Sequence, residues 1–252
     1  MARPLCCLLL LLCLCPAAWA GAPLLTPRVL AELPHDPQAF TQGLLFHGGL
    51  LYESVGKYGR SEVRAVDPDS GRVLRRTRLA AKYFAEGLAL VNGRLALLTW
   101  QEHAGFFLDL PDLRLNGDFV WEGEGWGLAS DKRLVLASDG SDSLRVLDPA
   151  RMTTLKRIPV RDGDRPVNEL NELELVQGLI WANIWMEDRV AVLDPDSGRV
   201  RAWIDLKPLR ARLKNPEAEA ANGLAFDPGS GRLYATGKFW DKVFVLALPR
   251  LP

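Results

Sequence analysis

A short pattern, a polar or aromatic residue followed by Gly-Leu, recurs along this 252-residue chain. The copies lie roughly 45 residues apart, a spacing typical of repeat architectures. They are Gln42-Gly43-Leu44, Glu86-Gly87-Leu88, Trp126-Gly127-Leu128 and Asn222-Gly223-Leu224, and Asn171-Glu172-Leu173 is a fifth copy with glutamate in place of glycine. Because a repeat determines the whole architecture, this pattern constrains the fold more than any other feature.

Each repeat contains short alternating apolar segments separated by turn residues, and long helical periodicity is lacking. The turn Asp-Pro-Asp-Ser-Gly-Arg occurs in equivalent places at 67–72 and 194–199, where Pro presets the turn and Gly supplies positive φ. A calcium loop is the alternative interpretation of this turn, but its carboxylates are too few. Four strands per unit of this length predict an all-β chain, a five-bladed β-propeller.

The ends of the repeat region predict how the ring closes. The fifth unit lacks its outermost strand, and a spare strand precedes the first unit at 27–33. We expect this N-terminal strand to join the last blade and so remove an exposed edge. The charged, Ala-rich stretch 206–221 is expected to form a loop or a short helix before that blade.

Residues 1–20 have the composition of a secretory signal peptide, with Arg3, an apolar block from Leu5 to Cys15, and a small-residue cleavage site at Ala18-Trp19-Ala20. The apolar block is shorter than the roughly 20 residues that span a bilayer, which disfavours a membrane anchor. All 4 cysteines lie here, so disulfides, zinc–thiolate sites and thiol catalysis are excluded from the mature chain. We expect a single secreted or periplasmic domain over 21–252, free of the membrane.

The overall charge is balanced, with 31 Lys and Arg against 31 Asp and Glu. No basic run stands out, so nucleic acid and anionic membranes are not expected as partners. His35, His47 and His103 are interpreted as loop or surface residues, which argues against a histidine-based metal site or serine triad. The fold type suggests a monomer.

One mouth of the propeller channel is predicted to be the binding site. The innermost strand of each blade lines the channel, and the antiparallel second strand returns to the same face. The predicted site therefore combines first-strand and second-strand residues, namely Gln42, Glu86, Trp126, Asn171, Asn222, Trp100, Asp139, Trp185 and Lys238. An aromatic pocket with a few polar groups is the default site of such a fold, although inner-strand polar residues can also simply bond around a wet channel. Trp121 and Trp203 are interpreted as blade packing.

Nearly the whole mature chain resembles the plant and bacterial type of glutaminyl-peptide cyclotransferase, a five-bladed propeller family. The matching stretches occur in order, and together they are more specific than any one of them. They are 35–44 (HDPQAFTQGL), 52–54 (YES), 84–88 (FAEGL), 98–100 (LTW), 123–128 (GEGWGL), 138–141 (SDGS), 170–174 (LNELE), 182–185 (ANIW) and 236–240 (TGKFW).

The resemblance implies a role for each matching position. Glu86 matches the acid/base glutamate, Asn171 and Lys238 match polar residues that orient the substrate, and Gln42 matches another polar lining position. The aromatic walls match Phe40, Phe84, Trp100, Trp126 and Trp185. Ala85, where glycine is common, is a mild departure that removes no chemical group.

The activity implied by the resemblance is an acyl transfer on peptides or proteins with N-terminal glutamine. That residue cyclises to pyroglutamate with loss of ammonia. The α-amine and the γ-carbonyl belong to one residue, so the site must hold a cyclisable conformer, and one carboxylate can carry the proton from the amine to the leaving nitrogen. No cofactor is required, although the channel can hold a structural divalent ion.

Two other functions are open at this point. A calcium-dependent lactonase-type propeller, a hydrolase, also gathers oxygen ligands at the channel mouth, and Glu86, Asn171, Asn222 and Asp139 are of the right types. Lys238 and the tryptophan wall argue against a cation there. A non-catalytic secreted binding propeller would bind peptides without releasing ammonia.

Overall fold

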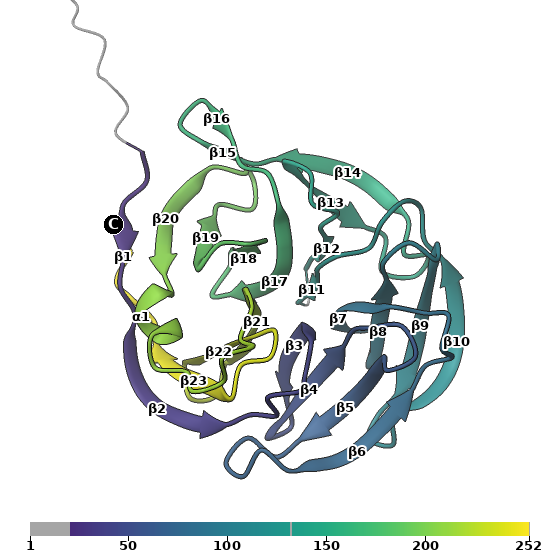
Figure 1. Cartoon of the computed structure of the whole chain (residues 1–252). Helices are drawn as coiled ribbons and strands as arrows, with labels where there is room; N and C mark the ends of the chain where they lie inside the picture. The colour runs from purple at the N-terminus through teal and green to yellow at the C-terminus, as the bar shows by residue number, and fades with distance from the viewer. Residues whose placement is uncertain (1–20, 132, 252) are drawn as a thin grey trace, which may run out of the picture.

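The computed structural model describes residues 21–131 and 133–251, which form an all-β ring of five antiparallel sheets (Figure 1). The five-bladed propeller predicted from the repeat is therefore confirmed. The predicted signal peptide, residues 1–20, lies outside the described residues. Among those residues, no helix is long and apolar enough to cross a membrane.

Each blade is a meander whose first strand lies innermost, against the first strands of its neighbours. Blade 1 contains β3 (Thr41–His47), β4 (Leu50–Val55), β5 (Glu62–Val66) and β6 (Val73–Arg78). Blade 2 contains β7 (Ala85–Val91), β8 (Arg94–Thr99), β9 (Ala104–Asp109) and β10 (Arg114–Val120). Blade 3 contains β11 (Leu128–Ser130), β12 (Val135–Ala137), β13 (Ser143–Leu147) and β14 (Thr154–Pro159).

The remaining two blades continue this plan. Blade 4 contains β17 (Leu170–Val176), β18 (Leu179–Ile184), β19 (Arg189–Leu193) and β20 (Val200–Asp205). Blade 5 contains β21 (Ala221–Asp227), β22 (Arg232–Gly237) and β23 (Lys242–Ala247). A hairpin of β15 (Arg161–Asp162) and β16 (Arg165–Pro166) precedes blade 4, and the expected short helix before blade 5 is α1 (Lys207–Arg210).

The N-terminal segment closes the ring as predicted. Strand β2 (Arg28–Pro34) pairs antiparallel with β23 and becomes the outermost strand of blade 5. The two-residue strand β1 (Leu24–Leu25), which no pattern predicted, pairs in parallel with β20 at the edge of blade 4. The purple N-terminal segment in Figure 1 therefore runs outside both blades. One segment thus covers the edges of two blades, which limits their availability to other strands.

The core is divided among the interfaces between blades. Five clusters of buried apolar side chains each join two neighbouring blades. Trp121 and Trp203 belong to two of these clusters, which confirms that they pack blades together. A sixth cluster is different, because Ala39, Phe40, Val55 and Phe84 gather with Trp100 and Phe239 away from the sheet interfaces.

The glycine of the repeated pattern is required by the close approach of neighbouring inner strands. A Cβ on Gly87 would lie 2.4 Å from the amide nitrogen of Leu128, and one on Gly127 would lie 2.1 Å from the carbonyl oxygen of Asn171. Inner strands therefore meet backbone to backbone around a narrow channel. This crowding brings the residue that precedes each glycine close to its counterparts in the other blades.

Glu172, which replaces the glycine in blade 4, uses its side chain to join three blades. Its buried carboxyl group accepts hydrogen bonds from the amides of Leu224 in blade 5, at 2.9 Å, and Leu44 in blade 1, at 3.3 Å. Desolvation raises the pKa of Glu172 well above its ordinary value, and the nearby Glu174 adds to the rise. In the fifth copy of the pattern, side-chain hydrogen bonds from neighbouring inner strands to Glu172 thus take the place of the close approach at glycine.

Candidate active site

A break in strand pairing aims the residue before each Gly-Leu pair at the channel mouth. The inner-strand register shifts at that point in four blades, between Thr41 and Gly43, Ala85 and Leu88, Leu170 and Leu173, and Ala221 and Leu224. Such bulges leave a residue outside the ladder and redirect its side chain, often next to active sites. In blade 3, strand β11 begins only at Leu128, the last residue of the pattern, and the Gly127 amide instead donates a 2.7 Å hydrogen bond to the Ser138 hydroxyl.

Glu86 is the central acid of this mouth and is only 4% exposed. The Gln42 amide donates a 2.6 Å hydrogen bond to Glu86 Oε1, and Asn222 donates to Gln42 Oε1 at 3.1 Å. A chain of side chains from blades 5, 1 and 2 therefore orients the carboxyl group. This chain of bonds engages only Oε1 of the Glu86 carboxyl group.

The pKa values of Glu86 and Lys238 are shifted toward each other. Desolvation raises the pKa of Glu86 well above its ordinary value, although the Lys238 ammonium and the Gln42 amide act in the opposite direction. Desolvation also lowers the pKa of Lys238, again opposed by its partner Glu86. Perturbed acid and base groups of this kind cluster at functional sites, and a raised carboxyl pKa suits proton transfer near neutral pH.

Aromatic side chains form two walls around the acid and the amine. In the first, Lys238 Nζ lies 4.7 Å from the ring centroid of Phe40, whose ring is 6.0 Å from that of Phe84; Phe84 in turn is 5.7 Å from Trp100. In the second, Trp126 and Trp185 meet edge to face at 5.6 Å. Trp185 is 42% exposed, which places part of this wall at the open rim.

Asn171 contributes a polar atom that the protein leaves unpaired. Its side chain is 3% exposed, and Oδ1 has no hydrogen-bond partner among the described residues. A buried acceptor without a donor is unfavourable, so a substrate N–H group that reached Oδ1 would relieve this cost. The structure thus brings the predicted polar residues Gln42, Glu86, Asn171 and Lys238 to the predicted mouth.

Sequence reasoning missed Glu124, which fixes the two tryptophans of the walls relative to each other. Glu124 Oε2 accepts hydrogen bonds from the indole nitrogens of Trp100, at 2.8 Å, and Trp126, at 2.9 Å. Desolvation opposes ionisation, but hydrogen bonds from Trp126, Gln101 and Trp100 hold the pKa of Glu124 below its ordinary value. A carboxylate between two glycines, two residues before a wall tryptophan, was the available signal.

Two further residues of the mouth left no recognisable pattern in the sequence. Glu102 accepts hydrogen bonds from the Tyr58 hydroxyl, at 2.7 Å, and from the Phe84 amide, at 3.2 Å. Lys57 places its ammonium nitrogen 3.8 Å from the centroid of Phe40, the ring that Lys238 also contacts. Both residues lie in loops between strands, where the sequence has no alternating hydrophobic pattern from which the position of a side chain could be predicted.

The interpretation of the histidines needs one correction. The side chain of His35 is only 4% exposed, with Nε2 3.0 Å from Glu53 Oε1 and Nδ1 2.7 Å from the carbonyl oxygen of Trp240. His35 does lie in a loop, between β2 and β3, but its side chain is buried at the junction of blades 1 and 5 rather than at the surface. His47 and His103 are exposed, as expected.

Two of the four residues considered for a calcium site, Asp139 and Asn222, make other side-chain contacts. Asp139 lies at the predicted end of its strand, but Arg145 binds its carboxylate at 2.7 Å and Ser141 donates to it at 2.5 Å. Asn222 is bonded to the Thr41 carbonyl oxygen and to Gln42. No group of three or more His, Cys, Asp or Glu residues in the described part of the chain is arranged to hold a metal ion.

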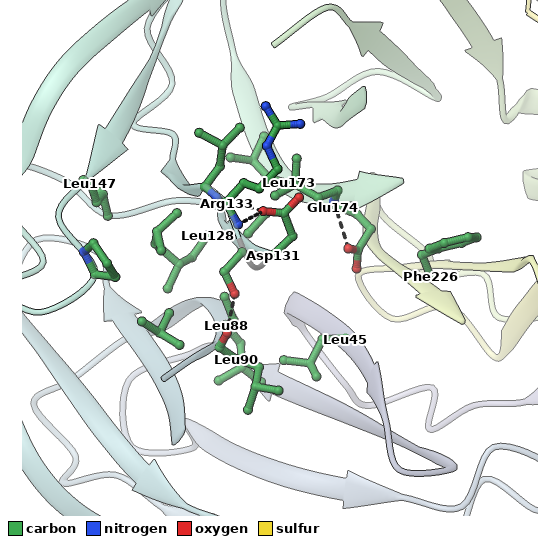
Figure 2. Close-up of a pocket in the computed structure, with 18 of the residues that line it drawn as sticks. Leu45, Leu88, Leu90, Leu128, Asp131, Arg133, Leu147, Leu173, Glu174 and Phe226 are labelled. Carbon is green, nitrogen blue, oxygen red and sulfur yellow. Dashed lines mark hydrogen bonds between the residues drawn. The ribbon is translucent and has the colours of Figure 1, made fainter. Parts of the chain in front are cut away.

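A cavity also lies at the opposite end of the channel (Figure 2). It has a volume of about 990 Å³ and is lined by the far ends of inner strands and the turns that follow them, with Leu45, Leu90, Leu128 and Phe226 among its residues. Of its two acidic residues, Asp131 and Glu174, the latter accepts a 2.8 Å hydrogen bond from the amide of Leu175. This cavity does not include Glu86 or Lys238 and therefore lacks the acid–amine pair.

Fold and site together define a class: a five-bladed propeller with a buried carboxyl–ammonium pair between aromatic walls, suited to binding a small polar group and moving a proton. The sequence model of the glutamine cyclotransferase family matches residues 5–248. This chain belongs to the glutamine cyclotransferase family, which confirms the resemblance seen in the motifs.

Two relatives illustrate the extent of the similarity. The chain is 41% identical over 226 residues to a glutaminyl-peptide cyclotransferase of Arabidopsis thaliana, and the match covers 88% of this chain and 71% of the plant protein. It is also similar to the crystal structure of Myxococcus xanthus glutaminyl cyclase, with a TM-score of 0.82 and 35% identity over 91% of this chain and 98% of the other.

Proposed function

We propose that this chain is a glutaminyl-peptide cyclotransferase, an acyltransferase that converts the N-terminal glutamine of peptides and proteins to pyroglutamate and releases ammonia. The observation that carries the proposal is Glu86, a buried carboxyl group with one oxygen held by Gln42 and with Lys238 nearby. The names of the Arabidopsis and Myxococcus relatives support the same activity.

The reaction is an intramolecular acyl transfer. The neutral α-amine attacks the side-chain carbonyl carbon of the same residue, forming a new C–N bond, and the bond from that carbon to the amide nitrogen breaks. The amine loses one proton and the leaving nitrogen gains one, so ammonia departs and the sum of atoms and charge is unchanged. Because both reacting groups belong to one residue, holding the folded conformer between the aromatic walls provides much of the catalysis.

Glu86 is the group proposed to move the proton. Its Oε1 is occupied by the Gln42 amide, which leaves Oε2 to take the proton from the attacking amine and deliver it to the leaving nitrogen. A carboxyl group with a raised pKa performs both steps more evenly near neutral pH, because neither protonation state is strongly favoured. Burial supplies that shift here.

Lys238 and Asn171 are proposed to orient the reacting groups. Negative charge develops on the carbonyl oxygen as the amine attacks, and the Lys238 ammonium can stabilise it in this water-poor site. The unpartnered Oδ1 of Asn171 is suited to accept an N–H of the substrate. The scheme needs no metal or other cofactor, and a structural divalent ion in the channel is a separate hypothesis.

The location and assembly of the protein are also proposals. The composition of residues 1–20 supports secretion or periplasmic residence, where peptides with N-terminal glutamine would be encountered. A monomer is proposed from the closed ring alone.

Ammonia release from a peptide amide beginning with glutamine tests the proposal. Glu86→Gln should lower kcat by about 10²–10⁴-fold, the usual contribution of a general acid–base group, while the circular dichroism spectrum stays that of the folded protein. Glu174→Gln is the matched control, since it changes an inner-strand glutamate at the opposite mouth and should leave turnover unaltered.

The other outcomes identify the rival functions. Normal turnover by Glu86→Gln would remove Glu86 from the mechanism. Saturable peptide binding without ammonia would indicate a binding propeller, and activity lost to a chelator and restored by calcium would indicate a calcium-dependent enzyme.

A further inference from the structure

A second, smaller cavity lies on the outer side of the Phe40 wall. It has a volume of about 280 Å³ and is bordered by Ala39, Gly56, Lys57 and Phe239, which also surround Phe40. The Gly56–Lys57 segment is packed tightly against the site, because a Cβ on Gly56 would lie 2.3 Å from the Phe84 ring and 3.0 Å from Gln42. The cavity therefore adjoins the candidate active site through one layer of side chains.

Basic residues outnumber acidic ones around this cavity, and most of them are already paired. Arg64 is bound by Asp36 at 2.8 Å and by Glu53 at 2.7 Å. Arg76 and Arg78 each lie 3.7 Å from the carboxylate of Glu62. These contacts use the acidic residues of the lining, Asp36 and Glu62.

Lys57 and Arg60 are the cations of this cavity without a carboxylate partner within residues 21–131 and 133–251. The Lys57 ammonium group rests over the rings of Phe40 and Phe239, at 3.8 and 5.8 Å from their centroids. Its backbone has a φ of 101°, in the left-handed region that is uncommon for a residue with a side chain. The loop thus holds the Lys57 ammonium group over the wall of the site.

The charges around the mouth are arranged asymmetrically. Glu124 lies in the connection between blades 2 and 3, and Glu102 lies in blade 2, where it accepts a hydrogen bond from Tyr58 of the loop that carries Lys57. Lys57 and Arg60 border the cavity that also includes Phe239 of blade 5. In a substrate peptide the α-amine lies at the N-terminus, and any carboxylate, from an acidic side chain or from the C-terminus, lies farther along the chain. With the N-terminal residue in the site, complementary charges would direct downstream carboxylates toward Lys57 and Arg60.

We propose that Lys57 and Arg60 bind a carboxylate of the substrate chain just after its N-terminal glutamine, so that acidic peptides are preferred. This inference rests on the proposed function. Lys57 and Lys238 contact the same Phe40 ring, and an extended chain advances about 3.3–3.6 Å per residue. The second or third residue of a substrate therefore reaches the cavity, and the carboxylate is either an acidic side chain or the C-terminus of a short peptide.

Matched pairs of peptides measure this preference. Gln-Glu-Ala-amide is compared with Gln-Gln-Ala-amide, Gln-Ala-Glu-amide with Gln-Ala-Gln-amide, and the acid Gln-Ala with its amide; the first two pairs test a side-chain carboxylate and the third a terminal one. The wild-type kcat/KM should be about 2–5-fold higher for the acidic member of at least one pair, the size expected for partly exposed ion pairs, and the difference should lie in KM.

Variants assign the preference to the two cations. Lys57→Met keeps an apolar side chain beside Phe40. Combined with Arg60→Gln, it should reduce the ratio of kcat/KM between the acidic and the neutral peptide of each pair to about 1. Any general effect on catalysis cancels within a pair. Lys156→Gln, an exposed residue on β14 of blade 3, is the control and should keep the wild-type ratio. Salt of about 1 M, where the Debye length is about 3 Å, should also diminish the ratio.

The failure of this inference can be told apart from failure of the proposed function. Ratios of 1 or less for every pair in the wild type, or a preference unchanged in the double variant, would overturn the carboxylate site even with vigorous ammonia release. The same peptide pairs bound to Glu86→Gln, followed by tryptophan fluorescence, report the preference in affinity without chemistry. If no peptide is cyclised, the proposed function fails while this binding comparison still decides the inference.

Discussion

The environment of Glu86 shows how one carboxyl group can be oriented and tuned at once. Burial raises its pKa, whereas the Lys238 ammonium and the Gln42 amide limit the rise. Gln42 is itself bonded to Asn222, so the orientation of the acid depends on three blades. The resemblance had assigned Gln42 only a lining role; the structure gives it the contact that positions the acid.

The pH dependence of Lys238 variants tests this coupling at the residue scale. Activity requires an ionised Glu86, so the rate should rise with pH through its pKa. Lys238→Met removes the charge that lowers this pKa, and the acid limb of kcat/KM should therefore move to higher pH, with a fall in kcat of about 10²–10³-fold from the lost stabilisation of the carbonyl oxygen.

A charge-preserving variant separates this effect from simple loss of packing. Lys238→Arg keeps a cation beside Glu86 and should leave the acid limb near its wild-type position, even if kcat falls. Identical acid limbs for Lys238→Met, Lys238→Arg and the wild type would contradict the proposed coupling.

At the scale of elements, the inner strands combine two features that serve the site. Glycine lets neighbouring strands meet backbone to backbone, and the bulge beside it turns the preceding residue toward the mouth. Position and direction of Glu86 thus come from the same short stretch of β7. The pattern recurs in the chain because the inner strand of each blade packs closely against its neighbours around one channel.

Substitution of an inner-strand glycine should damage stability and activity together. The Cβ of Gly87→Ala would lie 2.4 Å from the Leu128 amide nitrogen, in backbone that cannot move aside easily. We expect the free energy of unfolding to fall by about 1–3 kcal/mol, as for other overpacked positions, with a lower kcat because Glu86 is displaced.

Urea unfolding and ammonia release provide the two measurements for Gly87→Ala. Gly229→Ala is the control, since Gly229 lies in an exposed turn where a Cβ would meet only the Asp227 side chain, at 3.2 Å. Equal stability of the two variants would show that the inner strands can separate without cost.

For the whole molecule, ring closure is also what completes the site. The segment after β2 connects blade 5 to blade 1, and there the Phe239 amide donates to the Ala39 carbonyl oxygen at 2.7 Å. This contact holds Lys238, from the last blade, beside Phe40 at the start of the first. Below it, His35 and Arg64 both bind Glu53, joining the two blades by a buried polar cluster.

Glu53→Gln tests how much this junction contributes. Desolvation alone would raise the pKa of Glu53, but Arg64 and His35 hold it far below its ordinary value of 4.5. A carboxyl group whose pKa is lower in the folded state stabilises the fold at pH values above its unfolded-state pKa. This stabilisation is lost as the pH falls below the unfolded-state pKa and toward the folded-state pKa. We therefore expect Glu53→Gln to cost about 3–5 kcal/mol near pH 7, since it removes the buried carboxylate from Arg64 and leaves the partly exposed Asp36 as its closest carboxylate partner.

Unfolding midpoints measured across the acid range check the expected sign. The difference between Glu53→Gln and wild type should shrink below about pH 4.5, the unfolded value. Asp109→Asn, which alters an exposed pair with Arg114, should differ little from wild type at any pH. A constant difference for Glu53→Gln from neutral to acid pH would argue against an ionic role.

The fold and much of the site could be read from the sequence because their causes are local. Alternating strands, turn residues and the Gly-Leu pattern each act within a few residues, and their repetition predicts five blades and a spare strand for closure. The residue before Gly-Leu was expected at a shared mouth, and there Glu86 does bond to Gln42 and interact with Lys238, which follows the end of a second strand.

Contacts between loops of different blades were decided only by the tertiary structure. The bond from Gln42 to Glu86, the bridge of Glu124 between two tryptophans, the placement of Lys57 over Phe40 and the burial of His35 all depend on how far each blade is rotated about the channel. That rotation follows from side-chain packing at five interfaces. Packing of this kind sums many weak contacts between distant residues, and no short stretch of sequence records the result.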